Sequence, residues 1–201
     1  MMSADFIYLA SASPRRRELL QQIGVSFRLA GAELDETPRL SEAAAAYVSR
    51  LAAAKADAGW LSRSAAIAPV LAADTAVVLD GAILGKPRDR GDAEHMLLQL
   101  SGRTHEVMTA VAVRSSAGNE IKVSRSLVTF RDLDQAEVRA YWDTGEPRDK
   151  AGAYAIQGFG AIFIADLRGS YSGVMGLPLF ETAELLKAAG FRLGLRGAIS
   201  P

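Results

Sequence analysis

Three consecutive arginines (residues 15–17) follow Ser13 and Pro14 directly after the short apolar run 6–10. Ser is a favourable N-cap and Pro a favourable first helical residue, so we expect the arginines in the first turn of a helix. The free backbone N–H groups and the positive end of the macrodipole lie at that turn. This arrangement suits the oxygens of a phosphate or polyphosphate. The alternative is a solvated run of charge on the surface.

Two further polar residues stand where the pattern is otherwise apolar. Lys55 follows Leu51 by four residues and Val48 by seven, on the apolar stripe of an alanine-rich helix expected over 41–58. Its ammonium should therefore point towards the protein; the alternative is a lysine whose end reaches solvent at the edge of the stripe. Asp74 directly follows the apolar run 69–73, so we expect it at a strand end, where ligand sites of α/β sheets tend to lie. It could equally be a turn residue.

Other polar residues stand in the expected connections. Asp35 and Glu36 form an acidic pair after the expected strand 27–29. Hard cations such as Mg²⁺ take carboxylate oxygens together with substrate phosphates, although ordinary loop acids are the alternative. Lys86 precedes a proline, which favours an extended backbone. Gln157 is followed closely by two glycines, which allow a ligand or a second stretch of backbone to approach.

The elements that must position these residues alternate between strand and helix patterns, which indicates an α/β fold. Asp80 and Gly81 form a two-residue hairpin signal, so antiparallel pairs should enter the sheet. The run 107–113 is apolar on both faces and indicates a central strand. Asp134 and Glu137 have the spacing of a capping box. The other expected elements are strands over 6–10, 27–29, 69–73, 77–79, 82–84, 121–130 and 162–165, and helices over 14–23, 41–58, from 91 onward, and over 179–189.

The composition restricts the class of protein. The chain has 201 residues, 49% hydrophobic and 23% charged, with no repeat or linker, so we expect one domain over 1–201, with a core over about 5–191 and a disordered C-terminal tail. Lys plus Arg and Asp plus Glu both number 23, so no overall field would attract nucleic acid or an acidic membrane. The lack of cysteine excludes disulfides and thiolate chemistry. The N-terminal apolar run is too short for a signal peptide or a membrane span, so we expect the cytoplasm.

Other catalytic arrangements fit the sequence poorly. The two histidines are His95, on the outer part of an expected helix, and His105, at the start of an expected strand. A Ser-His-Asp triad would have to use one of them, and we expect structural roles instead. The chain has no Gly-rich loop that ends in Gly-Lys-Ser or Gly-Lys-Thr. Gly173 and Gly176 are expected to shape a pocket wall or the turn into the last helix.

The motifs occur in the order and wording of a known family, and the chain resembles the Maf nucleotide pyrophosphatases. The matching stretches are LASASPRRRELL (9–20), DET (35–37), AADT (72–75) with LDGAILGKP (79–87), SGRTHEVMTAVAV (101–113), DKAGAYAIQGFG (149–160) and GSYSGVMGLPL (169–179). The resemblance implies a Maf/ITPase-like fold, a mixed twisted β-sheet flanked by helices, often found as a homodimer. It also implies metal-dependent, house-cleaning hydrolysis of a nucleoside triphosphate to a monophosphate and pyrophosphate.

The resemblance also distinguishes two branches, one that prefers dTTP and UTP and one that prefers 7-methyl-GTP. Arg15, Thr75 and Gln157 stand at the positions associated with the first branch, whereas the second has other residues, such as Trp in place of Arg15. A uracil or thymine edge presents one N–H donor between two carbonyl acceptors, which a Gln amide and an Arg can complement. A missing partner would cost about 1 to 3 kcal/mol. We therefore expect dTTP and UTP, or modified pyrimidine nucleotides, as substrates.

In the mechanism that we expect, an activated water attacks the α-phosphorus and expels pyrophosphate, which requires positioning and charge neutralisation. Asp74 orients or deprotonates the water, and Glu36 with Asp74 holds Mg²⁺ or Mn²⁺. The expected catalytic residues are Arg16, Lys55, Asp74 and Lys86, and the expected substrate-binding residues are Ser11, Arg15, Arg16, Thr75 and Gln157. Two alternatives stay open: a nucleotide-binding regulator of cell division or septum formation with little turnover, and a 7-methyl-GTP pyrophosphatase.

Overall fold

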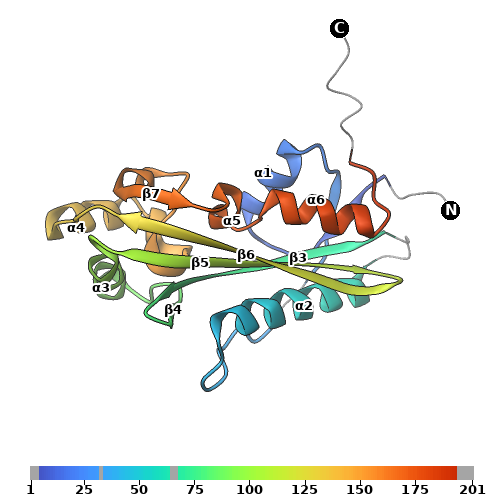
Figure 1. Cartoon of the computed structure of the whole chain (residues 1–201), viewed down its shortest axis with the longest axis horizontal. Coiled ribbons are helices and arrows are strands. Elements are labelled where there is room, and N and C mark those ends of the chain that lie inside the picture. The colour runs from blue at the N-terminus through green and yellow to red at the C-terminus, as the bar shows by residue number, and fades with distance from the viewer. Residues whose placement is uncertain (1–4, 32–33, 64–67, 194–201) are drawn as a thin grey trace, which may run out of the picture.

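The computed structural model describes residues 5–31, 34–63 and 68–193, which form a seven-stranded mixed sheet flanked by helices. The strand order is β2-β1-β3-β5-β6-β7, and β4 pairs with β3 outside this path. The α/β class and the mixed twisted sheet are therefore confirmed (Figure 1). The strands are β1 (Ile7–Leu9), β2 (Phe27–Leu29), β3 (Val70–Leu79), β4 (Ala82–Leu84), β5 (Thr104–Ser115), β6 (Gly118–Phe130) and β7 (Ile164–Arg168).

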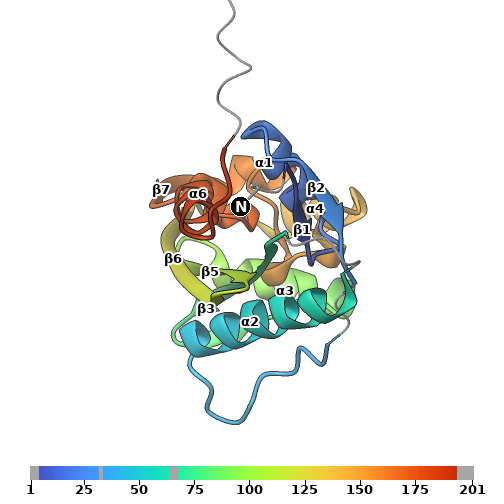
Figure 2. The same cartoon turned by 90° about the vertical axis from the view of Figure 1, so that its right-hand side faces the viewer.

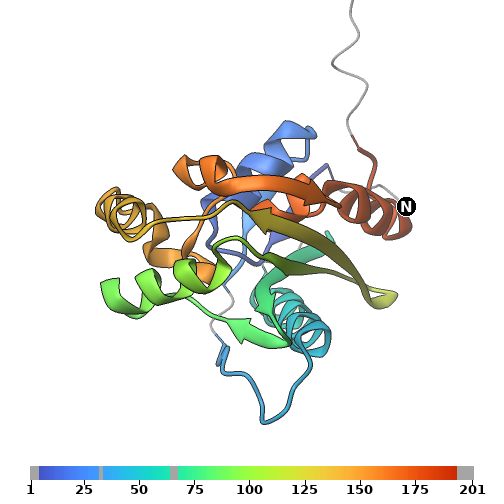
Figure 3. The same ribbon diagram turned by 60° about the vertical axis from the view of Figure 1, so that its left-hand side comes forward.

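Helices cover both faces of the sheet. In Figures 1 and 2, α2 lies along one face, while α1, α5 and α6 lie on the other. Figure 3 shows α3 and α4 side by side at one end of the sheet, where they contact each other. The helices are α1 (Pro14–Gln22), α2 (Ala44–Ser62), α3 (Arg90–Leu100), α4 (Gln135–Asp143), α5 (Tyr171–Met175) and α6 (Leu179–Ala188), with 3-10 turns η1 (Glu146–Asp149), η2 (Ala151–Ala153) and η3 (Phe159–Phe163). Within the described ranges, no helix has the length and apolar character needed to cross a membrane.

Local sequence signals account for several of these elements. Asp80 and Gly81 have φ angles of 50° and 81°, so they form the hairpin turn with two positive φ values that the sequence predicted between β3 and β4. The capping box of Asp134 and Glu137 at the start of α4 is present in both directions. The central strand is also confirmed, because β5 lies between β3 and β6.

The structure corrects the prediction for the region around Asp74. The sequence predicted two strands interrupted at this residue, but β3 is continuous over Val70–Leu79 and Asp74 lies in its middle. The reason is the neighbouring strand: β5 pairs with β3 along nearly its whole length, with Asp74 opposite Ala110. The other edge of β3 pairs with β1 only at Val70 and Leu71, and with β4 only from Val77 onward. Among the described strands, none pairs with that edge between Leu71 and Val77.

Three other boundaries differ from expectation. The helix expected over 41–58 begins only at Ala44, because Ser41 has a φ of 57° that a helix does not accommodate, and it continues to Ser62. The strand expected over 162–165 is β7 at Ile164–Arg168, and η3 precedes it. The expected disorder of the C-terminal tail concerns residues that lie outside the described ranges.

Alternation along β3 directs neighbouring side chains to opposite faces of the sheet. Val70, Ala72, Ala76 and Val78 belong to the apolar cluster beneath α2, whereas Leu71 and Ala73 pack with α1 and α6. Asp74 has the parity of the first set and therefore faces α2. Thr75 has the opposite parity and faces α1 and α5, so one strand supplies polar groups to both sides of its unpaired edge.

Candidate active site

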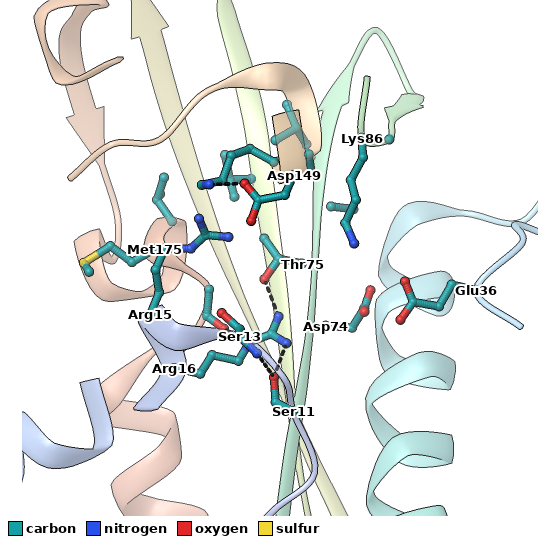
Figure 4. A pocket seen from close by; sticks show the side chains of 18 of the residues that line it. Ser11, Ser13, Arg15, Arg16, Glu36, Asp74, Thr75, Lys86, Asp149 and Met175 are labelled. Carbon is teal, nitrogen blue, oxygen red and sulfur yellow. Dashed lines mark hydrogen bonds and ion pairs between the residues drawn. The ribbon is translucent and has the colours of Figure 1, made fainter. Parts of the chain in front are cut away.

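A cavity of about 740 Å³ opens at the unpaired edge of β3, between α1, α2 and the segment 149–157 (Figure 4). All nine residues that the sequence assigned to a site line this cavity. They are Ser11, Arg15, Arg16, Glu36, Lys55, Asp74, Thr75, Lys86 and Gln157. The second acid of the loop pair, Asp35, is not among the described residues that line it, because its carboxylate accepts the N–H of Thr37 in an exposed turn (2.9 Å).

A lysine between two carboxylates forms the side of the cavity next to α2. Lys55 lies on the buried stripe of α2 and is itself buried, as the sequence predicted. Its Nζ is 2.7 Å from Oδ1 of Asp74 and 2.6 Å from Oε1 of Glu36. Asp74 reaches Lys55 because β3 directs it to the α2 face. The three residues come from a helix, a strand and a loop, and they meet at one ammonium group.

In each of the two acids, burial acts to raise the pKa of the carboxyl group and the neighbouring cations act to lower it. Burial raises the pKa of Asp74, and the charges of Lys55 and Arg16 only partly offset this effect. Burial also acts to raise the pKa of Glu36, but the hydrogen bond and charge of Lys55 outweigh it, so the pKa of Glu36 is lowered. Glu36 is about half exposed, whereas the side chain of Asp74 is about nine-tenths buried. The pair therefore combines a buried, more basic carboxylate with a more acidic one at the surface.

A partly buried arginine forms the opposite side. Arg16 donates from Nε to the carbonyl of Gly176 (2.7 Å), from Nη1 to Oγ of Ser11 (3.1 Å) and from Nη2 to Oγ1 of Thr75 (3.3 Å). Oγ1 of Thr75 lies 2.9 Å from that of Thr109, a pair directly across β3 and β5. Burial lowers the pKa of Arg16, against the attraction of Asp74. The guanidinium is thus held in one orientation by α5, β3 and the loop before α1.

The first turn of α1 brings Arg15 to the cavity beside Asp149 (Figure 4). Burial lowers the pKa of Arg15, and the charge of Asp149 is the largest opposing influence. Ser13 is the N-cap by position, as predicted, but its hydroxyl makes no capping hydrogen bond. Its N–H instead donates to Oγ of Ser11 (3.2 Å). The positive end of the helix therefore adjoins the cavity without a side-chain cap.

The far wall consists of the loop after β4 and the segment 149–157. The N–H of Gly152 donates to the carbonyl of Gly85 (3.0 Å), which joins this segment to the loop that carries Lys86. Tyr154 is buried in the wall, with its hydroxyl 2.8 Å from Nε2 of His105. Gln157 lies at the exposed end of the segment.

Neither histidine is placed for catalysis. His95 is exposed on α3, as expected. His105 is buried behind the wall against Tyr154 and Phe130, and burial lowers its pKa to about 4. The described part of the chain thus offers no histidine on the cavity lining, in agreement with the structural roles that the sequence predicted.

The carboxylates have the chemistry to hold a hard cation together with a substrate. The contacts of Lys55 use Oδ1 of Asp74 and Oε1 of Glu36, so a second oxygen of each acid can serve another ligand. Within the described ranges, no cluster of three or more acidic, histidine or cysteine side chains could enclose an ion. Mg²⁺ is commonly bound by one or two carboxylates with substrate phosphates and water completing the shell. The residues present fit that mode of binding.

Sequence reasoning missed part of the lining. It assigned no role to Tyr47, Asp149, Lys150, Tyr154 or Met175, all of which line the cavity. Asp149 and Lys150 begin the motif DKAGAYAIQGFG, and their place in a motif that also contains Gln157 could have indicated that they lie at the site. Tyr47 lies on the same helix as Lys55, two turns earlier, and its hydroxyl donates to the carbonyl of Glu36 (3.0 Å). That contact holds the loop that presents Glu36.

Known proteins resemble this chain over most of its length. The dTTP/UTP pyrophosphatase of Aromatoleum aromaticum is 54% identical over 201 residues, covering 93% of this chain and 97% of that protein. The proteins of the same name from Methylococcus capsulatus and Nitrosomonas europaea are 55% and 52% identical, over 92% and 94% of this chain and 91% and 96% of their own length. The Staphylococcus aureus Ham1 structure matches with a TM-score of 0.43 and 17% identity over 64% of this chain and 72% of that one, too low to carry an argument.

A family model described as Maf-like protein matches residues 6–189, which include every described site residue. The matched range runs from the residue before β1 to the end of α6 and its C-cap. The resemblance that the motifs suggested is therefore confirmed, and the chain belongs to the Maf family.

Proposed function

We propose that this chain is a nucleoside triphosphate pyrophosphatase that hydrolyses dTTP and UTP, or modified pyrimidine nucleotides, to the monophosphate and pyrophosphate. The observation that carries the proposal is the cavity in which the cationic side chains of Arg15, Arg16 and Lys86 line the same space as the carboxylates of Asp74 and Glu36, which Lys55 bridges. The names of relatives at 52–55% identity support the same activity and the same substrates.

In the proposed reaction, water attacks the α-phosphorus and pyrophosphate leaves. Arg16 and the first turn of α1 bind phosphate oxygens on one side of the cavity, and Lys55 and Lys86 bind them on the other. Asp74 orients the attacking water or accepts its proton. Its raised pKa makes it a better base than an exposed aspartate, while the charge and hydrogen bond of Lys55 favour its ionised form.

Glu36 and Asp74 are the proposed ligands of a divalent cation, Mg²⁺ or Mn²⁺. Such a cation supplies neutralisation of phosphate charge and lowers the pKa of water. The protein contributes two carboxylates of different basicity and holds both beside Lys55. Removal of the cation with a chelator should abolish turnover without unfolding the protein, because the described fold depends on packed apolar clusters.

Base selection is assigned to Arg15, Thr75 and Gln157. Gln157 stands at the exposed end of the far wall, and its amide offers one acceptor and one donor to a uracil or thymine edge. A purine such as 7-methylguanine presents a different edge and a larger ring system. The resemblance to the family also supports a homodimer and a cytoplasmic location as parts of the proposal.

The test is pyrophosphate release by the purified protein with Mg²⁺ or Mn²⁺ on dTTP, UTP, CTP, GTP and 7-methyl-GTP. Preferred cleavage of dTTP and UTP is the expected result. Cleavage confined to 7-methyl-GTP would contradict the base assignment. Tight binding of dTTP with negligible turnover would instead support the nucleotide-binding regulator.

An Asp74→Asn variant belongs in the same assay. The Asn oxygen can still accept from Lys55, so we expect the fold to remain. Loss of a general base typically lowers turnover by about 10²- to 10⁴-fold. Near-normal pyrophosphate release by this variant would remove Asp74 from the chemistry, and circular dichroism of the variant checks that it is folded.

A further inference from the structure

A carboxylate outside the cavity holds the turn that carries Gln157. Oε2 of Glu146 accepts the N–H of Phe159 (2.9 Å), and Oε1 accepts the N–H of Gly160 (3.1 Å). Oε1 also accepts the hydroxyl of Tyr141 (2.6 Å). Hydrogen bonds to a charged acceptor are stronger than those between neutral groups. One side chain therefore fixes the backbone immediately after Gln157.

Tyr141 fixes the backbone on the other side of the same turn. While its hydroxyl donates to Glu146, its oxygen accepts the N–H of Ala155 (3.1 Å). Tyr141 is buried, so this contact is shielded from water. The residues 155–160 are thus held at both ends, with Gln157 between the two points of attachment.

The glycines of the motif provide the space for this arrangement. A Cβ on Gly158 would collide with the carboxylate of Glu146. A Cβ on Gly160 would lie 2.7 Å from the hydroxyl oxygen of Tyr141 and 2.8 Å from the carbonyl of Ala155. The sequence indicated a close approach at these glycines by a ligand or a second backbone. The structure places a carboxylate and a phenol there.

Among the described residues, those that line the cavity include Gln157 but neither Glu146 nor Tyr141. Glu146 follows α4 in the chain and Tyr141 lies within α4, so a helix packed at the end of the sheet reaches the turn from behind. Both side chains can affect a bound nucleotide only through the turn that they hold.

We propose that Glu146 is a positioning residue for base recognition: with Tyr141 it holds the turn 155–160 so that Gln157 faces the base. This inference rests on the proposed function, in which the cavity binds a pyrimidine nucleotide. Glu146 contacts no reacting atom in this account. Its loss should impair the choice of base more than the rate of hydrolysis at saturating substrate.

The variant Glu146→Gln tests the inference, because its amide replaces one acceptor oxygen by an NH₂ group that cannot accept an N–H. We expect the ratio of kcat/KM for UTP over CTP to fall at least tenfold, mainly through KM for UTP, while kcat for UTP changes less than threefold. Gly158→Ala displaces the same carboxylate from the turn and should give the same loss. Because the two changes break one contact, the double variant should lose little more than either alone.

Glu137→Gln is the matched control. Glu137 also accepts backbone and guanidinium donors at the start of α4, but it holds the helix cap and not the turn. We expect this variant to lose stability and to keep the preference for UTP. Hydrogen exchange of the amides of Phe159 and Gly160 should accelerate in Glu146→Gln and stay unchanged in the control.

Two results would overturn the inference. One is a wild-type preference for UTP in both Glu146→Gln and Gly158→Ala although the two amides exchange faster. The other is unchanged exchange of these amides in Glu146→Gln, which would mean that Glu146 does not hold the turn. If the wild-type protein fails to cleave or to discriminate these nucleotides, the proposed function fails instead. In that case the binding of the non-hydrolysable analogue α,β-imido-dUTP to wild type and to Glu146→Gln tests the positioning role. Tenfold weaker binding by Glu146→Gln supports this role, and equal binding excludes it.

Discussion

Replacing Lys55 by Met removes the cation that the two site carboxylates share. Lys55 and Asp74 are both about nine-tenths buried as side chains, and their charged atoms are 2.7 Å apart. Removing one partner of a buried pair typically costs about 3 to 5 kcal/mol of unfolding free energy, because the other charge stays buried and unpaired. Glu36 is half exposed and adds little to this cost. We therefore expect Lys55→Met to lose about 3 to 5 kcal/mol at pH 8.

The loss should depend on pH in a defined direction. Burial already raises the pKa of Asp74, and Lys55 opposes that rise, so its removal raises the pKa further. Between the ordinary aspartate pKa of about 4 and the raised pKa of Asp74 in the folded variant, the unfolded chain has lost this proton while the folded variant retains it. Unfolding then releases a proton, so stability falls as the pH rises towards the folded pKa. The deficit should shrink on acidification by up to about 1.4 kcal/mol per pH unit.

Urea unfolding at pH 5, 6, 7 and 8, followed by tryptophan fluorescence, measures these differences. Lys122→Met is the matched control, because Lys122 and Glu184 form a pair of similar length (2.6 Å) on the surface. That variant should lose at most about 1 kcal/mol. The double variant Lys55→Met/Asp74→Asn should recover most of the stability. A deficit below about 1 kcal/mol in Lys55→Met, or one independent of pH, would refute the reasoning.

Two further outcomes follow from the geometry of the site. Arg16→Lys keeps the charge, but one ammonium cannot bond Gly176, Ser11 and Thr75 together; each lost hydrogen bond to a charged group is worth about 1.5 to 3 kcal/mol. We expect kcat/KM for dTTP to fall at least about tenfold, and activity within twofold of wild type would contradict this account. His105 has its pKa lowered to about 4 by burial, so it stays neutral in the folded protein while the unfolded chain takes up a proton below about pH 6.5. Wild type should therefore lose stability between about pH 6.5 and 4, and His105→Gln should show a shallower decline in urea unfolding at pH 7 and 5; an equal decline in both proteins would exclude this cause.

The sequence predicted the elements whose signals are local. The hairpin at Asp80 and Gly81, the capping box of α4 and the buried stripe that carries Lys55 each depend on residues within one or two turns of one another. The continuity of β3 could not be read in this way, because the polar pair Asp74 and Thr75 interrupts an apolar run. Pairing with β5, more than thirty residues away, overrides that interruption.

The same distinction applies to the site. The motif wording identified the nine residues that surround the cavity, but not the contacts among them. Alternation along β3 decides that Asp74 meets Lys55 and that Thr75 meets Arg16. Glu146 gave no local signal, because it reaches Gly160 across fourteen residues. Gly158 and Gly160 indicated only that a ligand or another part of the chain approaches the backbone closely at these positions.

Hydrolysis of dTTP in water enriched in ¹⁸O tests the central claim most directly, because it shows which phosphorus the water attacks. The proposed function predicts one ¹⁸O atom in dTMP and none in pyrophosphate, as mass spectrometry of the products would show, with labelled dTMP formed about 10²- to 10⁴-fold more slowly by Asp74→Asn. Label in pyrophosphate, or release of labelled inorganic phosphate with dTDP, would place the attack on another phosphorus and contradict the account.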